Sequence, residues 1–203
     1  MISVVDYGVA NLGSMLNMLR KVGVEAERIS TPEQLAAAER IILPGIGAFD
    51  QGMSALAERG LIDPLKRKGL LEGTPILGVC LGMQLLGDGS EEGVLGGLGL
   101  VAATSQRFHP PAGRGLKVPH MGWSRVTRRR DSPLMSGLDD QSRFYFVHSY
   151  HVCCEDPHDV LAVSHYGGEF VSVINRGNIF GVQFHPEKSH RFGMTVLRNF
   201  ASL

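Results

Sequence analysis

The first half of the chain alternates between two hydrophobic periods, which predict strands followed by helices. Short apolar, β-branched runs are typical of buried strands in a parallel sheet, and they occur at residues 2–5, 24–29 and 40–43 and again just before Cys80. Between these runs apolar residues recur at helical spacing, as in the segment that begins near Leu12. Strand and helix alternate four times in this way. The pattern predicts an α/β fold with a doubly wound, mostly parallel central sheet flanked by helices.

Helix boundaries in this half carry their own signals. Thr31 is a good N-cap, Pro32 suits the first helical position, and Gln34 stands where a capping box requires it. Residues 48–69 have the pattern of a helix that is interrupted near Gly60 and Pro64. These signals predict a helix that begins after Thr31 and a broken helical segment before the fourth strand.

The pattern changes after about residue 90. Glycines crowd residues 87–99, and the apolar runs that follow are short. They predict strands at 98–103, 123–127, 143–154, 160–164, 170–175 and 179–184, with a closing helix at 189–201. The sequence contains no low-complexity linker and no internal repeat. We therefore expect one domain over residues 1–203, in which the C-terminal half adds a mixed or antiparallel extension to the sheet.

Composition narrows the class of protein. The 203 residues are 43% hydrophobic, and 20 Lys and Arg balance 20 Asp and Glu, so nothing predicts a nucleic-acid or membrane-surface partner. No apolar stretch approaches the roughly 20 residues that span a bilayer, and the first residues lack the charged leader of a signal peptide. Three cysteines do not make a disulfide framework, which favours a reducing cytoplasm.

A cysteine flanked by glycines stands where the fourth predicted strand passes into a helix. The spacing Gly78-x-Cys80-x-Gly82 is that of the nucleophile elbow, a tight turn that lifts a nucleophile to the end of a sheet. The start of a helix also favours thiolate over thiol through the helix dipole. The alternative is a small buried cysteine in a glycine-rich turn.

A thiol nucleophile needs a base, and one of the eight histidines stands at a comparable place. His185 follows the strand predicted at 179–184, and Glu187 lies two residues further on, beyond Pro186. In an extended segment this separation puts both side chains on one side, where the carboxylate can orient the imidazole. The alternative is a surface histidine beside a capping carboxylate. Because His185 and Cys80 would both stand at strand ends, the triad is the better hypothesis.

The other parts of such a site are backbone groups. The N–H of Leu81, directly after the nucleophile, is the first expected oxyanion donor. The strand-end loop Pro44-Gly45-Ile46-Gly47 is expected to supply a second, because glycines let a peptide turn its N–H inward; the alternative is a simple tight turn. No residue spacing resembles a metal site, since His148 and His151 face opposite sides of an extended run. We expect no metal and no cofactor.

With these residues assembled, the sequence resembles the class I glutamine amidotransferases, the Cys-His-Glu enzymes that hydrolyse glutamine to deliver ammonia. The resemblance runs the length of the chain and is carried by Asp6-Tyr7-Gly8 with Asn11-Leu12, Leu43-Pro44-Gly45-Ile46-Gly47-Ala48-Phe49, Gly78-Val79-Cys80-Leu81-Gly82-Met83-Gln84-Leu85-Leu86, Ser90-Glu91-Glu92-Gly93, Lys117-Val118-Pro119-His120-Met121-Gly122-Trp123, Tyr145-Phe146-Val147-His148-Ser149-Tyr150 and Gly181-Val182-Gln183-Phe184-His185-Pro186-Glu187-Lys188-Ser189. The elbow and Phe184-His185-Pro186-Glu187 are common to the class. The loop at 44–47 and the run at 119–123 resemble one subfamily, the glutaminase subunits of histidine biosynthesis.

The resemblance implies a flavodoxin-like α/β fold and a chemical role for each catalytic residue. Cys80 would attack the carboxamide carbon of glutamine, with the oxyanion held by Leu81 and residues 45–47. His185, oriented by Glu187, would protonate the departing ammonia and leave a glutamyl thioester for water to hydrolyse. Gln84, one helical turn after Cys80, resembles a residue that grips the glutamine head group together with the backbone at Ser149 and Tyr150.

Free ammonia would be protonated and lost in water, so the resemblance implies a docked partner. That partner is a (βα)₈-barrel cyclase that converts a phosphoribulosyl-formimino ribonucleotide to imidazole glycerol phosphate and an aminoimidazole carboxamide ribonucleotide. The expected docking surface consists of Asn11, Pro119, His120, Met121, Gly122, Trp123, Tyr145 and Lys188. Trp123 is a candidate anchor, with a core or lid residue as the alternative, and Lys188 either reaches a partner carboxylate or is a plain surface lysine.

The glycines at the oxyanion loop also suggest a switch. In this family the isolated glutaminase is nearly silent until the partner binds its ligand. We expect the peptide between Gly45 and Ile46 to rest with its carbonyl toward Cys80 and to turn its N–H inward only in the liganded complex. Two departures from the family pattern fall near the expected subunit contact: Ala10 stands where glycine is usual, and Ser124 where asparagine is usual.

Three alternatives remain. A paralogue would feed ammonia to a related barrel enzyme in surface-sugar or cofactor biosynthesis. A catalytically silent adaptor would only stabilise a barrel partner, but it would not need Cys80, His185 and Glu187 together. A cysteine peptidase on a similar fold is disfavoured by Gln84 and by the Pro119-His120-Met121-Gly122-Trp123 run.

Overall fold

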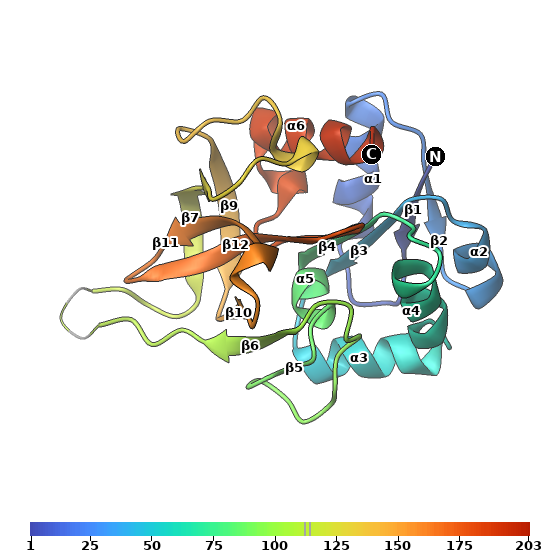
Figure 1. The fold of residues 1–203 in the computed structure, drawn as a ribbon, viewed down its shortest axis with the longest axis horizontal. Helices are drawn as coiled ribbons and strands as arrows, with labels where there is room; N and C mark the ends of the chain where they lie inside the picture. The colour runs from blue at the N-terminus through green and yellow to red at the C-terminus, as the bar shows by residue number, and fades with distance from the viewer. Residues whose placement is uncertain (112, 114) are drawn as a thin grey trace.

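A central sheet of eight strands organises the computed structural model, which describes residues 1–111, 113 and 115–203 (Figure 1). Its strands are β1 (Ile2–Val5), β2 (Ala26–Ile29), β3 (Ile41–Gly45), β4 (Ile76–Cys80), β8 (Thr127–Arg128), β11 (Val160–His165), β12 (Glu169–Arg176) and β13 (Ile179–Val182). They are ordered β2-β1-β3-β4-β13-β12-β11-β8. The first five strands of this order pair in parallel, and the last three add an antiparallel extension. The predicted fold class is confirmed.

Helices cover both faces of the sheet (Figure 1), and the interior parallel strands β1, β3, β4 and β13 are accordingly buried along their whole length, whereas the edge strand β2 is partly exposed. One face carries α1 (Leu12–Lys21) and α6 (His190–Ala201), and the other carries α2 (Pro32–Ala37), α3 (Phe49–Glu58), α4 (Ile62–Leu70) and α5 (Leu81–Leu85). Each face has its own apolar cluster. Leu19 and Phe200 belong to the first cluster, whereas Leu56 and Leu65 belong to the second.

Two smaller sheets and three short 3₁₀ helices complete the described chain. One small sheet has the order β10-β6-β5, with β10 (Tyr150–Cys154), β6 (Ala103–Arg107) and β5 (Gly89–Ser90), and the other pairs β7 (His120–Arg125) with β9 (Arg143–His148). The 3₁₀ helices are η1 (Pro133–Met135), η2 (Pro157–Asp159) and η3 (Pro186–Lys188). The strands of these sheets frame the edge at which the parallel strands end.

Several local predictions are confirmed and three are corrected. The Thr31 capping box is present with both of its hydrogen bonds, and α2 begins at Pro32. The helical segment at 48–69 breaks at residues 59–61 but not at Pro64, which lies in the first turn of α4, where a helix needs no N–H from it. The strand predicted at 98–103 is instead irregular chain, and β6 begins at its last residue.

The third correction concerns the apolar run at 143–154, which is two strands rather than one. Ser149 separates β9 from β10, and the two strands pair with different neighbours: β9 with β7, and β10 with β6. A period-2 pattern continues across such a change of partner, so the sequence does not reveal it. The break places the backbone of residues 149–150 at the sheet edge.

The carboxyl ends of the parallel strands meet at one edge of the sheet, as expected for a doubly wound fold. Gly45 at the end of β3 is paired in register with Cys80 at the end of β4, and Val182 at the end of β13 is paired with Val79. This register brings the elbow, the glycine loop and the residues after β13 together.

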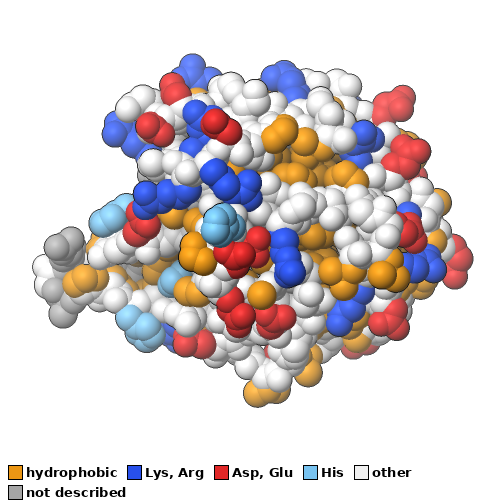
Figure 2. All heavy atoms as spheres, in the orientation of Figure 1, with side chains coloured by type: hydrophobic (Ala, Val, Ile, Leu, Met, Phe, Trp, Pro, Cys, Tyr) orange, Lys and Arg blue, Asp and Glu red, His pale blue; other side chains and the backbone are white. Residues whose placement is uncertain are grey.

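Two surface observations complete the description. No helix within the described ranges is long and apolar enough to cross a membrane. On the face drawn in Figure 2, basic and acidic side chains both occur, in keeping with the zero formal net charge of the chain.

Candidate active site

Cys80 occupies a strained turn between β4 and α5. Its backbone has φ 55° and ψ −110°, a left-handed conformation that is rare for a residue with a side chain. The flanking glycines are required by packing: a Cβ on Gly82 would lie 1.8 Å from the Leu43 carbonyl oxygen, and one on Gly78 would lie 2.6 Å from the Gly82 carbonyl oxygen. The predicted elbow is therefore present. The helix behind it has only five residues, so the dipole at the sulfur comes from a shorter helix than we expected.

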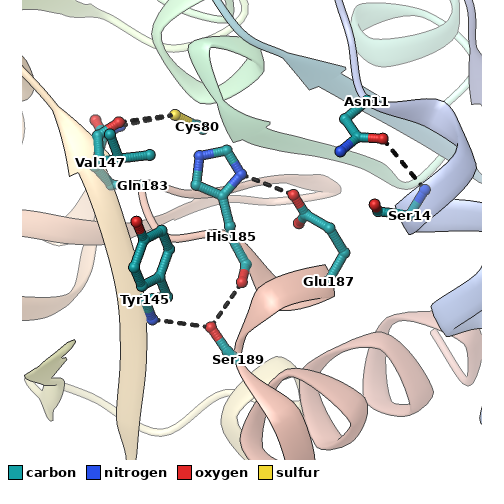
Figure 3. A network of polar contacts seen from close by, with 9 residues as sticks. All are labelled: Asn11, Ser14, Cys80, Tyr145, Val147, Gln183, His185, Glu187 and Ser189. Atoms are coloured by element: carbon teal, nitrogen blue, oxygen red, sulfur yellow. Dashed lines mark hydrogen bonds and ion pairs between the residues drawn. The ribbon is translucent and has the colours of Figure 1, made fainter. Parts of the chain in front are cut away.

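His185 and Glu187 form a buried pair beside the thiol. His185 Nδ1 lies 2.8 Å from Glu187 Oε1, and the two side chains are 2% and 5% exposed. A carboxylate only accepts hydrogen bonds, so Nδ1 carries the proton and Nε2 is left for the sulfur. Figure 3 shows the imidazole between Cys80 and Glu187. Cys80, His185 and Glu187 thus have the relative placement of a nucleophile, a base and the group that orients the base.

The electrostatics of His185 favour its charged form. Burial opposes the charge, but the Cys80 sulfur and the Glu187 carboxylate together raise the pKa of His185 to about 10. The imidazolium is therefore available at neutral pH to protonate a leaving group beside the sulfur.

The spacing of His185 and Glu187 predicted an extended segment after β13, but the structure does not have one there. Residues 186–188 form the 3₁₀ helix η3, and the turn itself brings Glu187 back to His185. Ser189, which sequence reasoning missed, holds this turn: its hydroxyl donates to the His185 carbonyl oxygen at 2.6 Å and accepts from the Tyr145 N–H at 3.0 Å (Figure 3). The His185 N–H in turn donates to the Tyr145 carbonyl oxygen. Strand β9 therefore fixes the base.

The oxyanion loop is close to the sulfur, but one of its donors points elsewhere. Gly45 lies so near the elbow that a Cβ there would be 2.5 Å from the Tyr7 hydroxyl oxygen and 2.9 Å from the Gly82 nitrogen. The Ile46 N–H donates to the carbonyl oxygen of Val9 at 2.9 Å. Gly47 follows with φ +98°. Of the predicted donors, the Leu81 N–H follows the nucleophile directly, whereas the Ile46 N–H is engaged with Val9.

A cleft of about 300 Å³ opens over Cys80 and brings together residues from all of these segments. Ten of the predicted site and docking residues line it: Ile46, Gly47, Cys80, Leu81, Gln84, Pro119, Ser149, Tyr150, His185 and Lys188. Three further lining residues were not predicted: Glu92, Val147 and His148. The Glu92 carboxylate is oriented by the Phe49 N–H at the start of α3, at 2.9 Å. Its place in the run Ser90-Glu91-Glu92-Gly93 was the only signal in the sequence.

The Gln84 side chain is buried in the cleft wall and its amide direction is determined by its partners. Its Nε2 donates to the Tyr150 carbonyl oxygen and to Gln183 Oε1, each at 3.2 Å. Both N–H groups are thereby used, and Oε1 is left as an acceptor for a ligand. Gln183, which sequence reasoning did not single out, donates from Nε2 to the Cys80 sulfur at 3.8 Å.

The predicted docking residues lie mostly on the surface, with one exception. Asn11, Pro119 and Lys188 are exposed, and so are Met121 and Trp123, at 62% and 46%. His120 is only 2% exposed, so it is not part of this surface. The reason is the period of strand β7, on which residues 121 and 123 face outward and His120 faces inward.

Aromatic contacts order the exposed part of this surface. The Trp123 ring stacks on His190, with centroids 5.4 Å apart and an angle of 4° between the planes. Lys188 Nζ lies 5.7 Å from the centroid of the half-buried Tyr145 ring. Trp123 is thus neither a core residue nor a free side chain.

The comparisons with known proteins agree with this geometry. A sequence model of the family described as "Glutamine amidotransferase class-I" matches residues 3–202. The chain belongs to this family. It is therefore a glutamine amidotransferase, as the motifs predicted. Within the described residues, no group of three or more His, Cys, Asp or Glu side chains could hold a metal ion.

Related proteins extend the similarity along the whole chain. The chain is 49% identical over 203 residues to "Imidazole glycerol phosphate synthase subunit HisH 2" of Pseudomonas aeruginosa, with all of both chains covered. It is 49% identical over 200 residues to the HisH 2 subunit of Methanococcus maripaludis, with 98% of each covered, and 45% identical over 204 residues to the HisH subunit of Leptospira interrogans, with all of both covered.

Solved structures at lower identity share the fold. The structure of PurLQS from Thermotoga maritima has a TM-score of 0.76 at 20% identity and covers 99% of this chain and 97% of that chain. A glutamine amidotransferase from Thermotoga maritima has a TM-score of 0.65 at 18% identity, with coverage of 99% of this chain and 82% of that chain.

Proposed function

We propose that this chain is the glutaminase subunit of an imidazole glycerol phosphate synthase. It hydrolyses L-glutamine through a thioester on Cys80 and passes the ammonia to a (βα)₈-barrel cyclase subunit in histidine biosynthesis. The observation that carries the proposal is the buried Cys80–His185–Glu187 constellation in a cleft lined by residues 46, 47, 84 and 149–150. Full-length similarity to HisH subunits supports the choice of pathway.

In the proposed reaction the Cys80 sulfur attacks the carboxamide carbon of glutamine. The tetrahedral oxyanion is stabilised by the Leu81 N–H and by the Ile46 N–H once it has turned inward. The imidazolium of His185 gives its Nε2 proton to the departing ammonia, which leaves a glutamyl thioester. His185 then takes a proton from water as the water attacks the thioester, and glutamate and the free thiol are released.

Recognition of glutamine follows from the polar groups of the cleft. The α-ammonium group needs acceptors, and the free Gln84 Oε1 and the Glu92 carboxylate are both available in the cleft wall. The backbone at Ser149 and Tyr150 lies beside them, as the sequence predicted for the head-group site. No cofactor takes part in the proposed chemistry.

The Ile46–Val9 hydrogen bond supports the proposed partner control. While this bond is made, the Ile46 N–H cannot stabilise an oxyanion at Cys80. The chain alone should then hydrolyse glutamine slowly, until contact with the liganded cyclase turns the peptide. The proposed docking surface consists of Asn11, Pro119, Met121, Trp123, Tyr145 and Lys188. We further propose that residues 1–203 act as one domain and in the cytoplasm, where thiols stay reduced.

The decisive experiment measures glutamine hydrolysis by the purified chain with and without the candidate cyclase and its ribonucleotide ligand. We expect little glutamate from the chain alone and strong stimulation in the complex. Cys80→Ala should abolish glutamine use but leave ammonia-driven cyclisation by the partner intact. Release of glutamate by Cys80→Ala would refute the assignment of the nucleophile.

A second candidate keeps the chemistry and changes the acceptor. Two of the related proteins carry the name HisH 2, and this numeral is the observation that favours a paralogue, which would feed ammonia to a related barrel enzyme of another pathway. Copurification of the chain from its own cells separates the two candidates. Recovery of a barrel enzyme that makes no imidazole glycerol phosphate would favour the paralogue.

A further inference from the structure

Two buried histidines, His148 in the wall of the cleft and His120 beside it, belong to a row of hydrogen-bonded polar groups that the reaction above does not use. His120 on β7 and His148 on β9 are directly opposite each other across the two strands, and both side chains are buried. His120 Nδ1 lies 3.2 Å from His148 Nε2. At the two ends, His120 Nε2 lies 3.0 Å from Ser124 Oγ, and His148 Nδ1 lies 2.7 Å from the Tyr150 carbonyl oxygen. The contacts are continuous from Ser124 to Tyr150.

The direction of every hydrogen bond between Ser124 and Tyr150 is determined by the Tyr150 carbonyl group at one end. The Tyr150 carbonyl oxygen can only accept, so His148 Nδ1 must carry its proton. Burial lowers the pKa of His148 to about 3 and that of His120 to about 4, so both rings are neutral at pH 7. His148 Nε2 then accepts from His120 Nδ1–H, and His120 Nε2 accepts from the Ser124 hydroxyl. A reversed tautomer would set two lone pairs against each other.

The hydrogen bonds continue from the Tyr150 carbonyl group to the Cys80 sulfur. The Tyr150 carbonyl oxygen also accepts from Gln84 Nε2, and the second N–H of that amide reaches Gln183 Oε1. The Gln183 amide group is thereby turned so that its Nε2 donates to the Cys80 sulfur. Each amide orientation depends on the one before it, because an amide that flips replaces a donor with an acceptor.

We propose that Ser124, His120 and His148 are positioning residues for glutamine hydrolysis, which hold the Tyr150 carbonyl and through it orient the Gln84 and Gln183 amides. This inference rests on the proposed function, since it concerns the same glutamine site. Gln84 then presents Oε1 to the substrate, and Gln183 presents an N–H to the sulfur. His148 is the central member, because it bridges the break between β9 and β10.

Packing alone does not account for the two histidines. The His120 ring is stacked between Tyr166 and Phe146, with centroid distances of 4.1 and 5.1 Å. An aromatic hydrocarbon side chain would make the same stacks. It would leave the buried His148 Nε2 without a donor, and a buried polar group without a partner is costly.

The first test reads the tautomers directly. In a two-bond ¹H–¹⁵N correlation spectrum of the ¹⁵N-labelled chain at pH 7, His120 and His148 should both appear as neutral rings protonated at Nδ1, which is the tautomer that free imidazole side chains disfavour in water. Spectra of His120→Phe and His148→Leu assign the signals. A His148 ring protonated at Nε2, or an imidazolium, overturns the proposal.

The second test compares two substitutions of the same ring. Asparagine places an N–H where His148 has Nδ1–H, whereas leucine has no donor. In the complex with the cyclase and its ligand, His148→Leu should raise the KM for glutamine about tenfold with kcat changed less than about threefold, because one of two donors on the Tyr150 carbonyl is lost. His148→Asn should stay within about threefold of wild type in KM.

Other outcomes are decisive in either direction. Equal KM values for the two variants, with only a lowered thermal midpoint, mean that the histidines act through packing alone and overturn the proposal. If neither variant folds, the tautomers of the wild-type chain still decide. If the wild-type complex releases no glutamate, the proposed function fails. The spectrum still reports whether His120 and His148 have the tautomers that the proposed hydrogen bonds require.

Discussion

The backbone N–H of Ile46 donates a 2.9 Å hydrogen bond to the carbonyl oxygen of Val9 and is thereby turned away from Cys80. In this conformation Cys80, His185 and the Leu81 N–H stand where the proposed reaction requires a nucleophile, a base and an oxyanion donor, but the Ile46 N–H, the proposed second donor, is engaged with Val9. The proposed site is thus preorganised except for a single peptide group.

Substitution of Ile46 should change the resting activity. A β-branched residue makes the rotated peptide less accessible than glycine does, so Ile46→Gly should raise glutamine hydrolysis by the isolated chain about fivefold, the equivalent of about 1 kcal/mol. Ile46→Pro is the matched control, since it has no N–H for either state. It should lower hydrolysis in the complex about 10²- to 10³-fold. Equal resting rates for wild type and Ile46→Gly would contradict the switch.

Loss of the Glu187 charge should slow the chemistry without unfolding the protein. Glu187→Gln keeps the shape of the side chain but no longer stabilises the imidazolium of His185, with which it makes a 2.8 Å contact. We expect kcat for glutamine in the complex to fall about 10²- to 10⁴-fold. Glu155→Gln, at an exposed position, is the control and should behave as wild type. A Glu187→Gln enzyme of normal kcat would exclude Glu187 from the triad.

Acid should destabilise the fold through the buried histidines. His120 and His148 have folded-state pKa values lowered to about 4 and about 3, whereas an unfolded chain binds the same protons near pH 6.5. Below pH 6.5 the unfolded state binds more protons, so stability is lost as the pH falls, by up to about 1.4 kcal/mol per pH unit for each histidine. Denaturant titrations at pH 7 and pH 5 measure the loss. His148→Leu should show a smaller loss than wild type, and an equal loss would be evidence against a neutral His148.

Truncation of the exposed tryptophan should weaken the partner complex. Trp123 is half exposed and stacked on His190, so it is ordered before docking. Trp123→Ala should raise the Kd for the cyclase about 30-fold, the size of a loss of about 2 kcal/mol. Leu71→Ala removes an exposed leucine at the end of α4 and should leave the Kd unchanged. Calorimetric titration with the cyclase measures both, and equal Kd values would place the interface elsewhere.

The elbow glycine should be intolerant of any side chain. In Gly82→Ala the new methyl group would stand 1.8 Å from the Leu43 carbonyl oxygen, so we expect a loss of about 3 kcal/mol or more in unfolding free energy. Gly13→Ala in α1 meets nothing within 4 Å and should stabilise by about 0.5–1 kcal/mol. Urea unfolding of the two variants gives both values. A stable Gly82→Ala would mean that α5 and β3 are less closely packed than they are here.

Features that depend on neighbours along the chain were predictable from the sequence. The Thr31 capping box depends on contacts within a few residues, and the parallel strands depend on two-sided burial. Gly78 and Gly82 were recognised by their spacing around Cys80, although the contact that excludes a side chain at Gly82 is with the distant Leu43. The contact between His185 and Glu187 was also predicted, and the structure contains it. Their geometry was wrong, because a 3₁₀ turn and not an extended segment brings them together.

The choice of long-range partners was decided only by the tertiary structure. The period of residues 143–154 does not change at Ser149, although β9 and β10 pair with different strands. His120 is buried because β7 faces the core on that side, and the Ile46 N–H is turned away because Val9 accepts it. The sequence by itself determined which groups could do chemistry, since residue type and local spacing carry that information. Which of them meet, and in which direction each hydrogen bond runs, depends on atoms far apart in the chain.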